Sequence, residues 1–252
     1  MQIEQPEQLA ILSAVGGSPI EMFQQCRDDS PNWMISTSGG EQERRNLDLR
    51  WLPGAAQAYG VSPDLSDYVV VPVTTVVSSC PNMNGDAILP ADLLQYNPEY
   101  AKYAYQTFIG KGTYVEHRDN LVLKAAKGLI LDAYVTNLDG YKGNRVLLHE
   151  LLGYDRTKDS NLARAVLKRE INSYSIGVRY HAYTCSITGR MFKTSEKSPY
   201  TEPFKPTYML NDGSRRLVYR YLHQLCGVET SAVGTPAFPV AFSNVISDLS
   251  RV

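Results

Sequence analysis

The segment that most constrains the fold is DYVVVPVTTVVSS, at residues 67–79. It is dense in β-branched residues, which lose side-chain freedom in a helix but pack well on a pleated sheet. Pro72 interrupts the segment, and a proline cannot donate to a ladder of backbone hydrogen bonds. The segment therefore predicts a strand that lies at a sheet edge or contains a bulge.

Short strand candidates follow along the rest of the chain, separated by glycine or charged turns. RRLVYRYLHQL and VETSAVGTPA together are expected to form one or two strands. The complete set is TYVEHRDN (113–120), KGLILDAYV (127–135), NRVLLHELL (144–152), NSYSIGVRY (172–180), RRLVYRYLHQL (215–225) and VETSAVGTPA (228–237).

Three segments favour helices. Residues 91–106 have a helical pattern, with Pro98 as a break. Residues 161–170 place Leu162, Ala163, Val166 and Leu167 on one face, and Asp159 or Ser160 can cap the start. Residues 238–250 are expected to close the chain as a short helix. The fold class is therefore α+β, mainly β.

Residues 1–65 have a different texture from the rest. Apart from an apolar patch at residues 9–15, they are rich in glycine, serine, proline and charge, which is typical of loops. We expect an N-terminal extension or regulatory arm over residues 1–65, followed by one domain over residues 66–252.

Composition excludes several classes of function. The chain has 252 residues, of which 43% are hydrophobic, and a formal net charge of −1 without long blocks of one sign. This balance speaks against a nucleic-acid or anionic-membrane partner. No run approaches the ~20 apolar residues of a membrane span, and the N-terminus lacks the pattern of a secretory signal, so we expect a cytoplasmic protein.

The histidines and cysteines do not form a metal-binding pattern. Neither the four histidines nor the four cysteines stand at ligand spacing, so no metal and no cofactor are predicted, and the cysteines are expected to be reduced and mostly buried. They are His117, His149, His181, His223, Cys26, Cys80, Cys185 and Cys226.

A catalytic site, if present, would therefore use an organic nucleophile and base. Ser175 is a candidate nucleophile because Gly177 would leave its strand face open to a developing oxyanion. Ser173 lies on the same face and competes with it, and either residue can be an ordinary strand serine.

His117, in a polar cluster after a strand, is a candidate base or a surface histidine. Glu229 stands among small and apolar residues, where a carboxylate must face solvent or be paired. The other three histidines are expected to be structural.

Seven motifs stand in one order between roughly residues 66 and 242: PNMNGDAI, VEHRDN, KGLILDAYV, LLGYDR with NLARAVLKRE, SYSIGV, YTCSITG and VETSAVGTPAFPVA. Together they resemble the head maturation (prohead) proteases of large tailed bacteriophages, which share the fold of the herpesvirus assemblin serine proteases. The resemblance implies an assemblin-like closed or partly open β-barrel surrounded by a few helices.

The same resemblance implies the site. Ser175 would be the nucleophile and His117 its general base. Glu229 holds the place at which assemblins have a second histidine, and a carboxylate there could fix the tautomer of the base. The fallback candidates for this third position are Asp119, Asp132 and Asp155.

Two departures from the family affect the site. Many relatives have a Cys-x-x-Cys pair after the serine strand, whereas this chain has CSIT from Cys185 to Thr188, so no zinc is predicted. Assemblins also supply an arginine after the third triad member, and the region around TPAFPVA has none. Gly177 and Arg179 are the candidates for oxyanion or substrate contacts.

The resemblance further implies the biological role. The substrates would be scaffold or core proteins, the major capsid protein and internal proteins of the phage prohead, in the host cytoplasm, with retention in the virion head as a further expectation. Cleavage would follow a glutamate, and GGE ending at Glu41 suggests self-cleavage. Assemblins also suggest a homodimer. The alternative is a catalytically silent scaffold or structural component of the phage head.

Overall fold

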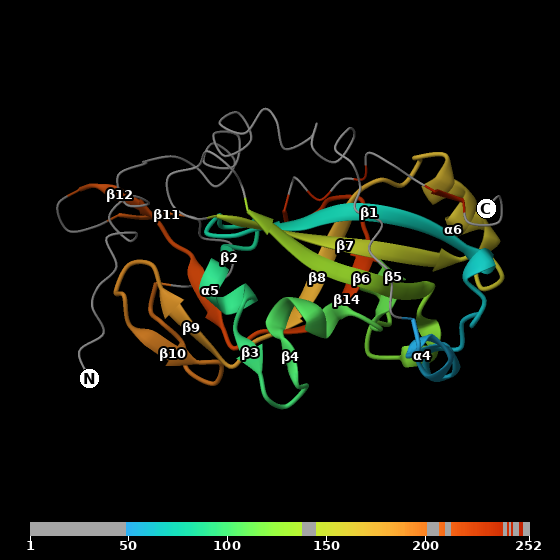
Figure 1. The fold of residues 1–252 in the computed structure, drawn as a ribbon. Helices are drawn as coiled ribbons and strands as arrows, with labels where there is room; N and C mark the ends of the chain where they lie inside the picture. Colours follow the sequence, from blue (N-terminus) through green and yellow to red (C-terminus); the bar gives the residue numbers. More distant parts are fainter. Residues whose placement is uncertain are drawn as a thin grey trace.

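The computed structural model describes residues 49–137, 145–200, 207–209, 213–238, 241, 243 and 247–248. The described chain is mainly β, with few helices around a large sheet that curls into a half-barrel (Figure 1). This confirms the α+β, mainly β fold class predicted from the strand pattern.

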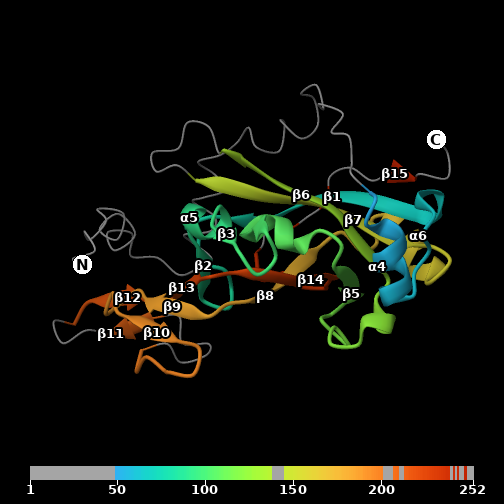
Figure 2. The same ribbon diagram turned by 60° about the horizontal axis from the view of Figure 1, so that its bottom comes forward.

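The large sheet has seven strands, and β14 and β5 are parallel neighbours while the other neighbours are antiparallel. In spatial order the strands are β15 (Ser247–Asp248), β1 (Tyr68–Val77), β7 (Val146–Asp155), β6 (Gly128–Asn137), β5 (Gly112–Val115), β14 (Cys226–Ala232) and β8 (Tyr174–Arg179). Figure 2 shows β14 and β8 running below β1, β6 and β7. One apolar core fills the interior, with contributions from both β1 and β8.

Strand β1 confirms the strand and the bulge predicted for the β-branched segment, although β15, and not β1, is the edge strand of the sheet. Its register against β7 shifts between Thr74 and Val76, which is a bulge. On its other side β15 pairs only with Val69 and Val70. Pro72 therefore lies beyond the end of that pairing, where its missing N–H removes no ladder hydrogen bond in the described sheet.

A smaller sheet lies at one end of the molecule, away from α4 and α6 (Figure 1). It has four strands in the order β10 (Met191–Lys193), β9 (Ala182–Cys185), β13 (Arg220–His223) and β2 (Asp86–Ile88). Two hairpins complete the strands, β3 (Tyr96–Asn97) with β4 (Lys102–Tyr103), and β11 (Thr207–Met209) with β12 (Arg215–Leu217). The region 215–237 thus forms three strands, β12, β13 and β14, where one or two were expected.

The helix predicted after Asp159 is confirmed. Helix α6 spans Ser160–Leu167, and the Asp159 carboxylate accepts a hydrogen bond from the Leu162 N–H at 3.0 Å. Leu162 and Val166 are buried on its inner face. The cap and three of the four predicted apolar positions, including Ala163, act as the sequence indicated, whereas Leu167 in the last turn is 37% exposed and does not belong to the buried face.

The helix predicted over residues 91–106 is wrong. Only α5 (Pro90–Leu93) and the 3₁₀ turn η2 (Ala104–Phe108) are helical there, and the β3–β4 hairpin lies between them. The Asn97 side chain accepts the Glu99 N–H at 3.0 Å and so stabilises the turn at Pro98. Tyr96 and Tyr103 then meet edge to face across the hairpin at 5.7 Å. The local turn and the aromatic pair override the helical pattern.

The closing helix expected over residues 238–250 is also wrong in its last part, because Ser247–Asp248 form strand β15 against β1. Extended pairing with an otherwise open strand edge supplies hydrogen bonds that a short terminal helix would leave unmade. Much of the remainder of that segment lies outside the described residues.

Residues 49–65, expected in the N-terminal extension, pack on the large sheet. Helix α4 (Leu52–Tyr59) buries Leu52 and Ala56 in a second apolar cluster with Tyr68, Leu129 and Leu131. The 3₁₀ turn η1 (Leu65–Asp67) then leads directly into β1. This part of the expected arm therefore belongs to the packed domain, and residues 1–48 lie outside the described residues.

The described helices include none that is long and apolar enough to cross a membrane.

Candidate active site

His117 lies in a tight turn immediately after β5. Because β5 runs parallel to β14, the chain leaves β5 beside Ala232 and turns back over Ser231. Glu116 and His117 both have a φ of 53°, in the left-handed region that non-glycine residues rarely adopt. The His117 N–H donates to the Ser231 hydroxyl at 3.2 Å, which fixes the turn to β14. Such backbone conformations often occur at functional sites.

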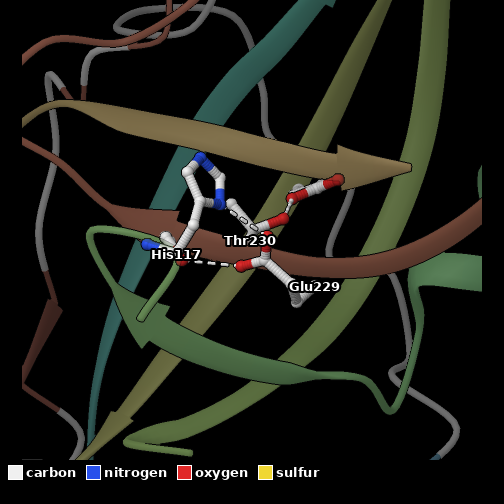
Figure 3. A network of polar contacts seen from close by, with 5 residues as sticks. His117, Glu229 and Thr230 are labelled. Carbon is white, nitrogen blue, oxygen red and sulfur yellow. Dashed lines mark hydrogen bonds and ion pairs between the residues drawn. The ribbon is translucent and has the colours of Figure 1, made fainter. Parts of the chain in front are cut away.

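Glu229 provides the partner of the His117 ring. Its side chain on β14 is 0% exposed, and its Oε1 lies 2.6 Å from His117 Nδ1 (Figure 3). The Ser231 hydroxyl donates to the other carboxylate oxygen, Oε2, at 2.6 Å. Both oxygens of this buried carboxylate are therefore engaged, as a buried charge requires.

Gly177 makes room for this carboxylate. Glu229 and Gly177 are direct cross-strand partners on β14 and β8. A Cβ atom added at Gly177 would lie 2.3 Å from Glu229 Oε1 and 3.0 Å from its Cδ. The space next to Gly177, expected to be open for substrate or an oxyanion, is filled by the Glu229 side chain.

Ser175 lies on the same face of the sheet as this acid–histidine pair. It is the direct cross-strand partner of Ser231, and its side chain is buried in the folded chain at 7% exposure. Directly opposite side chains on neighbouring strands have Cβ atoms about 5 Å apart. Ser231 itself contacts both His117 and Glu229. The register therefore places Ser175 next to the pair.

The Ser175 hydroxyl has no hydrogen bond to the His117 ring in the described part of the chain. His117 Nδ1 is directed to Glu229, which leaves Nε2 as the ring nitrogen that can act on a hydroxyl. Catalytic hydrogen bonds are often long in the absence of substrate and tighten in the complex. The arrangement is compatible with a serine nucleophile but is not a closed triad.

The hydrogen bond with Glu229 raises the pKa of His117 above its usual value, and burial of the ring opposes that effect. The carboxylate stabilises the imidazolium and selects the tautomer that carries its proton on Nδ1 when neutral. A histidine held in this way can accept a proton at Nε2 and keep it while a bond is broken.

The remaining residues proposed from sequence lie elsewhere. Ser173 donates its hydroxyl to the Val233 carbonyl, so it is a structural serine. Arg179 is exposed at the end of β8, four residues from Ser175 and hence about 13 Å away along the strand. That distance is long for a direct contact with an oxyanion at Ser175.

The three fallback acids do not contact His117 in the described contacts. Asp155 Oδ2 accepts the Ser62 N–H at 2.7 Å, and its Oδ1 accepts the Thr157 hydroxyl at 2.7 Å. Asp132 Oδ1 accepts the N–H of Ala133, and Asp119 lies in the turn with a φ of 56°. Of the four acids considered, Glu229 is the one that the fold brings to the imidazole.

A second acid–histidine–hydroxyl arrangement occurs in the small sheet. His223 Nδ1 lies 3.0 Å from Asp92 Oδ1, and His223 Nε2 lies 2.8 Å from the Thr184 hydroxyl. Thr184 is in the middle of β9, paired with both β10 and β13, so both of its backbone edges are covered. A substrate strand cannot lie beside it, and we assign this cluster a structural role.

His149 is a buried structural histidine, as predicted. Its ring lies between the hydroxyls of Thr74 and Thr136, at 3.0 and 2.7 Å. Burial lowers the pKa of His149 to about 4. A neutral imidazole with both nitrogens engaged has no free atom for proton transfer.

Ser231 is a site residue to which sequence reasoning assigned no role. The Glu-x-Ser spacing indicates that Ser231 lies on the same face as Glu229, since residues i and i+2 of a strand share one face. Its role depends on the His117 turn, which no local pattern in β14 reveals.

The described residues contain no group of three or more His, Cys, Asp or Glu side chains arranged to hold a metal ion. Cys80, Cys185 and Cys226 are buried thiols outside any disulfide, as predicted, and Cys26 lies outside the described residues.

Comparisons with known proteins give no match: neither a protein family, nor a curated protein, nor a solved structure is significantly similar to the chain.

Proposed function

We propose that this chain is a serine endopeptidase of the assemblin-like class, with Ser175, His117 and Glu229 as its catalytic residues. The observation that carries the proposal is the 2.6 Å contact between His117 Nδ1 and the buried Glu229 carboxylate, on the same sheet face as Ser175. This contact supplies the acid and the imidazole of a proton-relay site, and the proposal adds Ser175 as the hydroxyl on which His117 Nε2 would act. The curled, mainly β sheet with few helices is compatible with the assemblin-like barrel implied by the sequence motifs.

The proposed reaction proceeds through an acyl-enzyme. Ser175 Oγ attacks the scissile carbonyl carbon while His117 Nε2 takes the hydroxyl proton, and Glu229 stabilises the resulting imidazolium. His117 then gives the proton to the leaving amine as the C–N bond breaks. Water attacks the Ser175 ester, His117 accepts a proton from it, and the acid product leaves as the proton returns to Ser175.

The outer edge of β8 is the proposed place for the substrate backbone. The Ser173 carbonyl accepts the Val233 N–H, whereas the Tyr174 N–H donates to Ala241 on the opposite side. Because backbone groups alternate along a strand, the peptide groups of Ile176 and Val178 point away from β14. Among the described strands β8 pairs with β14 alone.

A pocket is lined by alternate side chains of β8 on the sheet face opposite to Ser175, and we propose that it receives side chains of a substrate strand added at that edge. Ile176, Val178 and Tyr180 line it on one side, and Asp86, Leu222 and Phe238 contribute to the rest. Addition of an extended peptide to an exposed strand edge would bring a carbonyl past the serine strand. We infer that cleavage acts on extended segments of proteins rather than on folded surfaces.

The substrate class and location follow from the motif resemblance alone. They are scaffold or core, capsid and internal proteins of a phage prohead, cut after glutamate, with the enzyme enclosed in the assembling head in the host cytoplasm. A homodimer, suggested by the assemblins, is part of the same proposal.

A fluorophosphonate probe tests the nucleophile without knowledge of the substrate. Such a probe forms an Oγ–P bond with an activated serine and releases fluoride. We expect one label per chain, located on the peptide containing Ser175 by mass spectrometry. Ser175→Ala and His117→Ala should abolish labelling, whereas Thr184→Ala, in the small sheet, should be labelled as the wild type.

The alternative function is a catalytically silent scaffold or structural component of the phage head. The absence of a Ser175–His117 hydrogen bond in the described structure favours this alternative. An unlabelled wild-type protein that also leaves co-expressed head proteins intact would support it. Truncation of a head protein that persists in Ser175→Ala would instead contradict the assigned nucleophile.

A further inference from the structure

A cluster of polar side chains lies inside the curled sheet, behind the candidate site. Glu150 of β7 is 1% exposed and its Oε2 accepts the hydroxyl of Thr230, on β14, at 2.6 Å. Tyr154 of β7 and Tyr174 of β8 lie in the same interior, with their ring centroids 6.4 Å apart. The cluster therefore brings polar side chains of three strands together inside the sheet, and the hydrogen bond between Thr230 and Glu150 joins β14 to β7.

Several of these groups lack a hydrogen-bond partner among the described residues, which is unusual for buried polar atoms. They are Thr75 Oγ1, Glu150 Oε1, Tyr154 Oη and Tyr174 Oη. Thr75 lies beside Glu150 without meeting the geometry of a hydrogen bond. An ionised carboxylate at Glu150 would be a buried charge without a cation, and a neutral carboxyl avoids that cost.

Thr230 joins this interior cluster to the site on the other face of β14. Successive side chains of a strand point to opposite faces, so Thr230 points inward while its neighbours Glu229 and Ser231 point outward. Figure 3 shows Thr230 between the two sets of polar contacts. The hydrogen bond to Glu150 therefore fixes Thr230 from inside the sheet, and with it the adjoining peptide groups of Glu229 and Ser231.

We propose that Glu150 is a positioning residue for the Glu229–His117 pair: its carboxyl accepts the Thr230 hydroxyl and so fixes this part of β14, and its ionisation would disturb the pair by placing a second negative charge close to Glu229. The effect of Glu150 on the contact between Glu229 and His117 does not depend on whether the chain is an enzyme. Its consequence for catalysis rests on the proposed function.

The electrostatic surroundings agree with a neutral Glu150. The pKa of Glu150 is raised to about 8, because burial, with a smaller contribution from the nearby Glu229 carboxylate, outweighs the opposing effect of the Thr230 hydroxyl. The titratable groups that face it are Tyr154 on its own strand, Tyr174 on β8 and Glu229 across β14. None of these is a cation, and its neighbours in the flanking strands, Val73 and Ala133, are apolar. Ionisation would add a second negative charge close to Glu229.

The first test measures unfolding of the full chain by denaturant as a function of pH, in wild type and Glu150→Gln. An unfolded glutamate has a pKa of about 4.3, so between about pH 5 and 8 the folded wild type holds one proton more than the unfolded chain. The wild-type unfolding constant should therefore rise about tenfold per pH unit relative to Glu150→Gln. Glu170→Gln, at an exposed position, should follow the wild type.

The second test follows the His117 ring by NMR, with its signals assigned by comparison with His117→Ala. In the wild type the Nδ1–H signal should change in a step near pH 8, as Glu150 ionises, and Glu150→Gln should lack that step. A role confined to stability would leave this signal unchanged. If Glu150→Gln does not fold, carbon-labelled glutamate in the wild type should show one carboxyl that titrates near pH 8.

The inference that Glu150 is neutral would be wrong if the unfolding constants of wild type and Glu150→Gln had the same pH dependence. It would also be wrong if all glutamate carboxyls titrated near pH 4. A pH-linked unfolding constant without a step at His117 would overturn the positioning role. Ser175→Ala should show both effects unchanged, because neither readout requires peptidase activity. Failure of the proposed enzyme and failure of this inference are thus separate results.

Discussion

Replacing Gly177 by alanine should displace the candidate acid without straining the backbone. The added Cβ would lie 2.3 Å from Glu229 Oε1, whereas ordinary contacts are about 3.5 Å, so the carboxylate must retreat by about 1 Å. The 2.6 Å hydrogen bond to His117 Nδ1 would then be lost. Overpacking of a filled site costs about 1–3 kcal/mol, and because His117 is 37% exposed we place the total near the middle, at about 2 kcal/mol.

The assay is urea unfolding at neutral pH, combined with an NMR titration of His117. In Gly177→Ala we expect the pKa of His117 to fall toward its usual value, because the hydrogen bond that its ring donates to Glu229 is what raises it. Gly54→Ala is the matched control, since nothing lies within 4 Å of its Cβ position in helix α4. That control should gain about 0.5–1 kcal/mol. Unchanged stability and an unchanged His117 titration in Gly177→Ala would refute the close packing of glycine and carboxylate.

Further predictions concern pH, helix capping, self-cleavage and the second histidine cluster. Labelling of Ser175 should increase with pH through the raised pKa of His117, because only the neutral imidazole accepts a proton; a rate independent of pH would contradict His117 as base. Asp159→Ala should lower the free energy of unfolding by about 1 kcal/mol in urea denaturation, through loss of the cap to α6. Intact mass should reveal cleavage after Glu41, which lies outside the described residues, in the wild type and not in Ser175→Ala. Thr184→Ala should retain labelling and substrate cleavage, and their loss would move the active site to the small sheet.

The strands could be predicted because the residues of each strand favour extended structure without help from distant parts of the chain. A run of β-branched residues such as Val69 to Val71 fits a pleated, buried surface in almost any context. The Asp159 cap is equally local, since donor and acceptor lie three residues apart. Residues 91–106 were mispredicted because the Tyr96–Tyr103 contact is formed only after the chain has turned. Helical spacing of apolar residues cannot be distinguished from a short hairpin when aromatic rings meet across it.

The candidate site could be predicted only in part. His117, Ser175 and Glu229 were selected from motif order, and the fold places Glu229 against His117. The role of Gly177 was not predictable, because the carboxylate that needs its missing side chain lies on another strand. The link from Glu150 to Thr230 joins residues 80 positions apart, and nothing in either local sequence indicates it.

The orientation of Glu229 depends on one irregularity that the alternating pattern hides. Residues 227 and 229 would share a face in a regular strand, but the register of β14 against β8 shifts between them. Gly227 consequently packs inward, where a Cβ would lie 2.5 Å from the Phe108 ring, and Glu229 points outward beside Gly177. Without this bulge Glu229 would oppose Ile176 and point into the apolar interior, since a one-residue slip moves every side chain to the other face. A single extra residue in β14 therefore decides whether the carboxylate reaches His117, and the interior contact between Thr230 and Glu150 holds the strand in the register that the bulge creates.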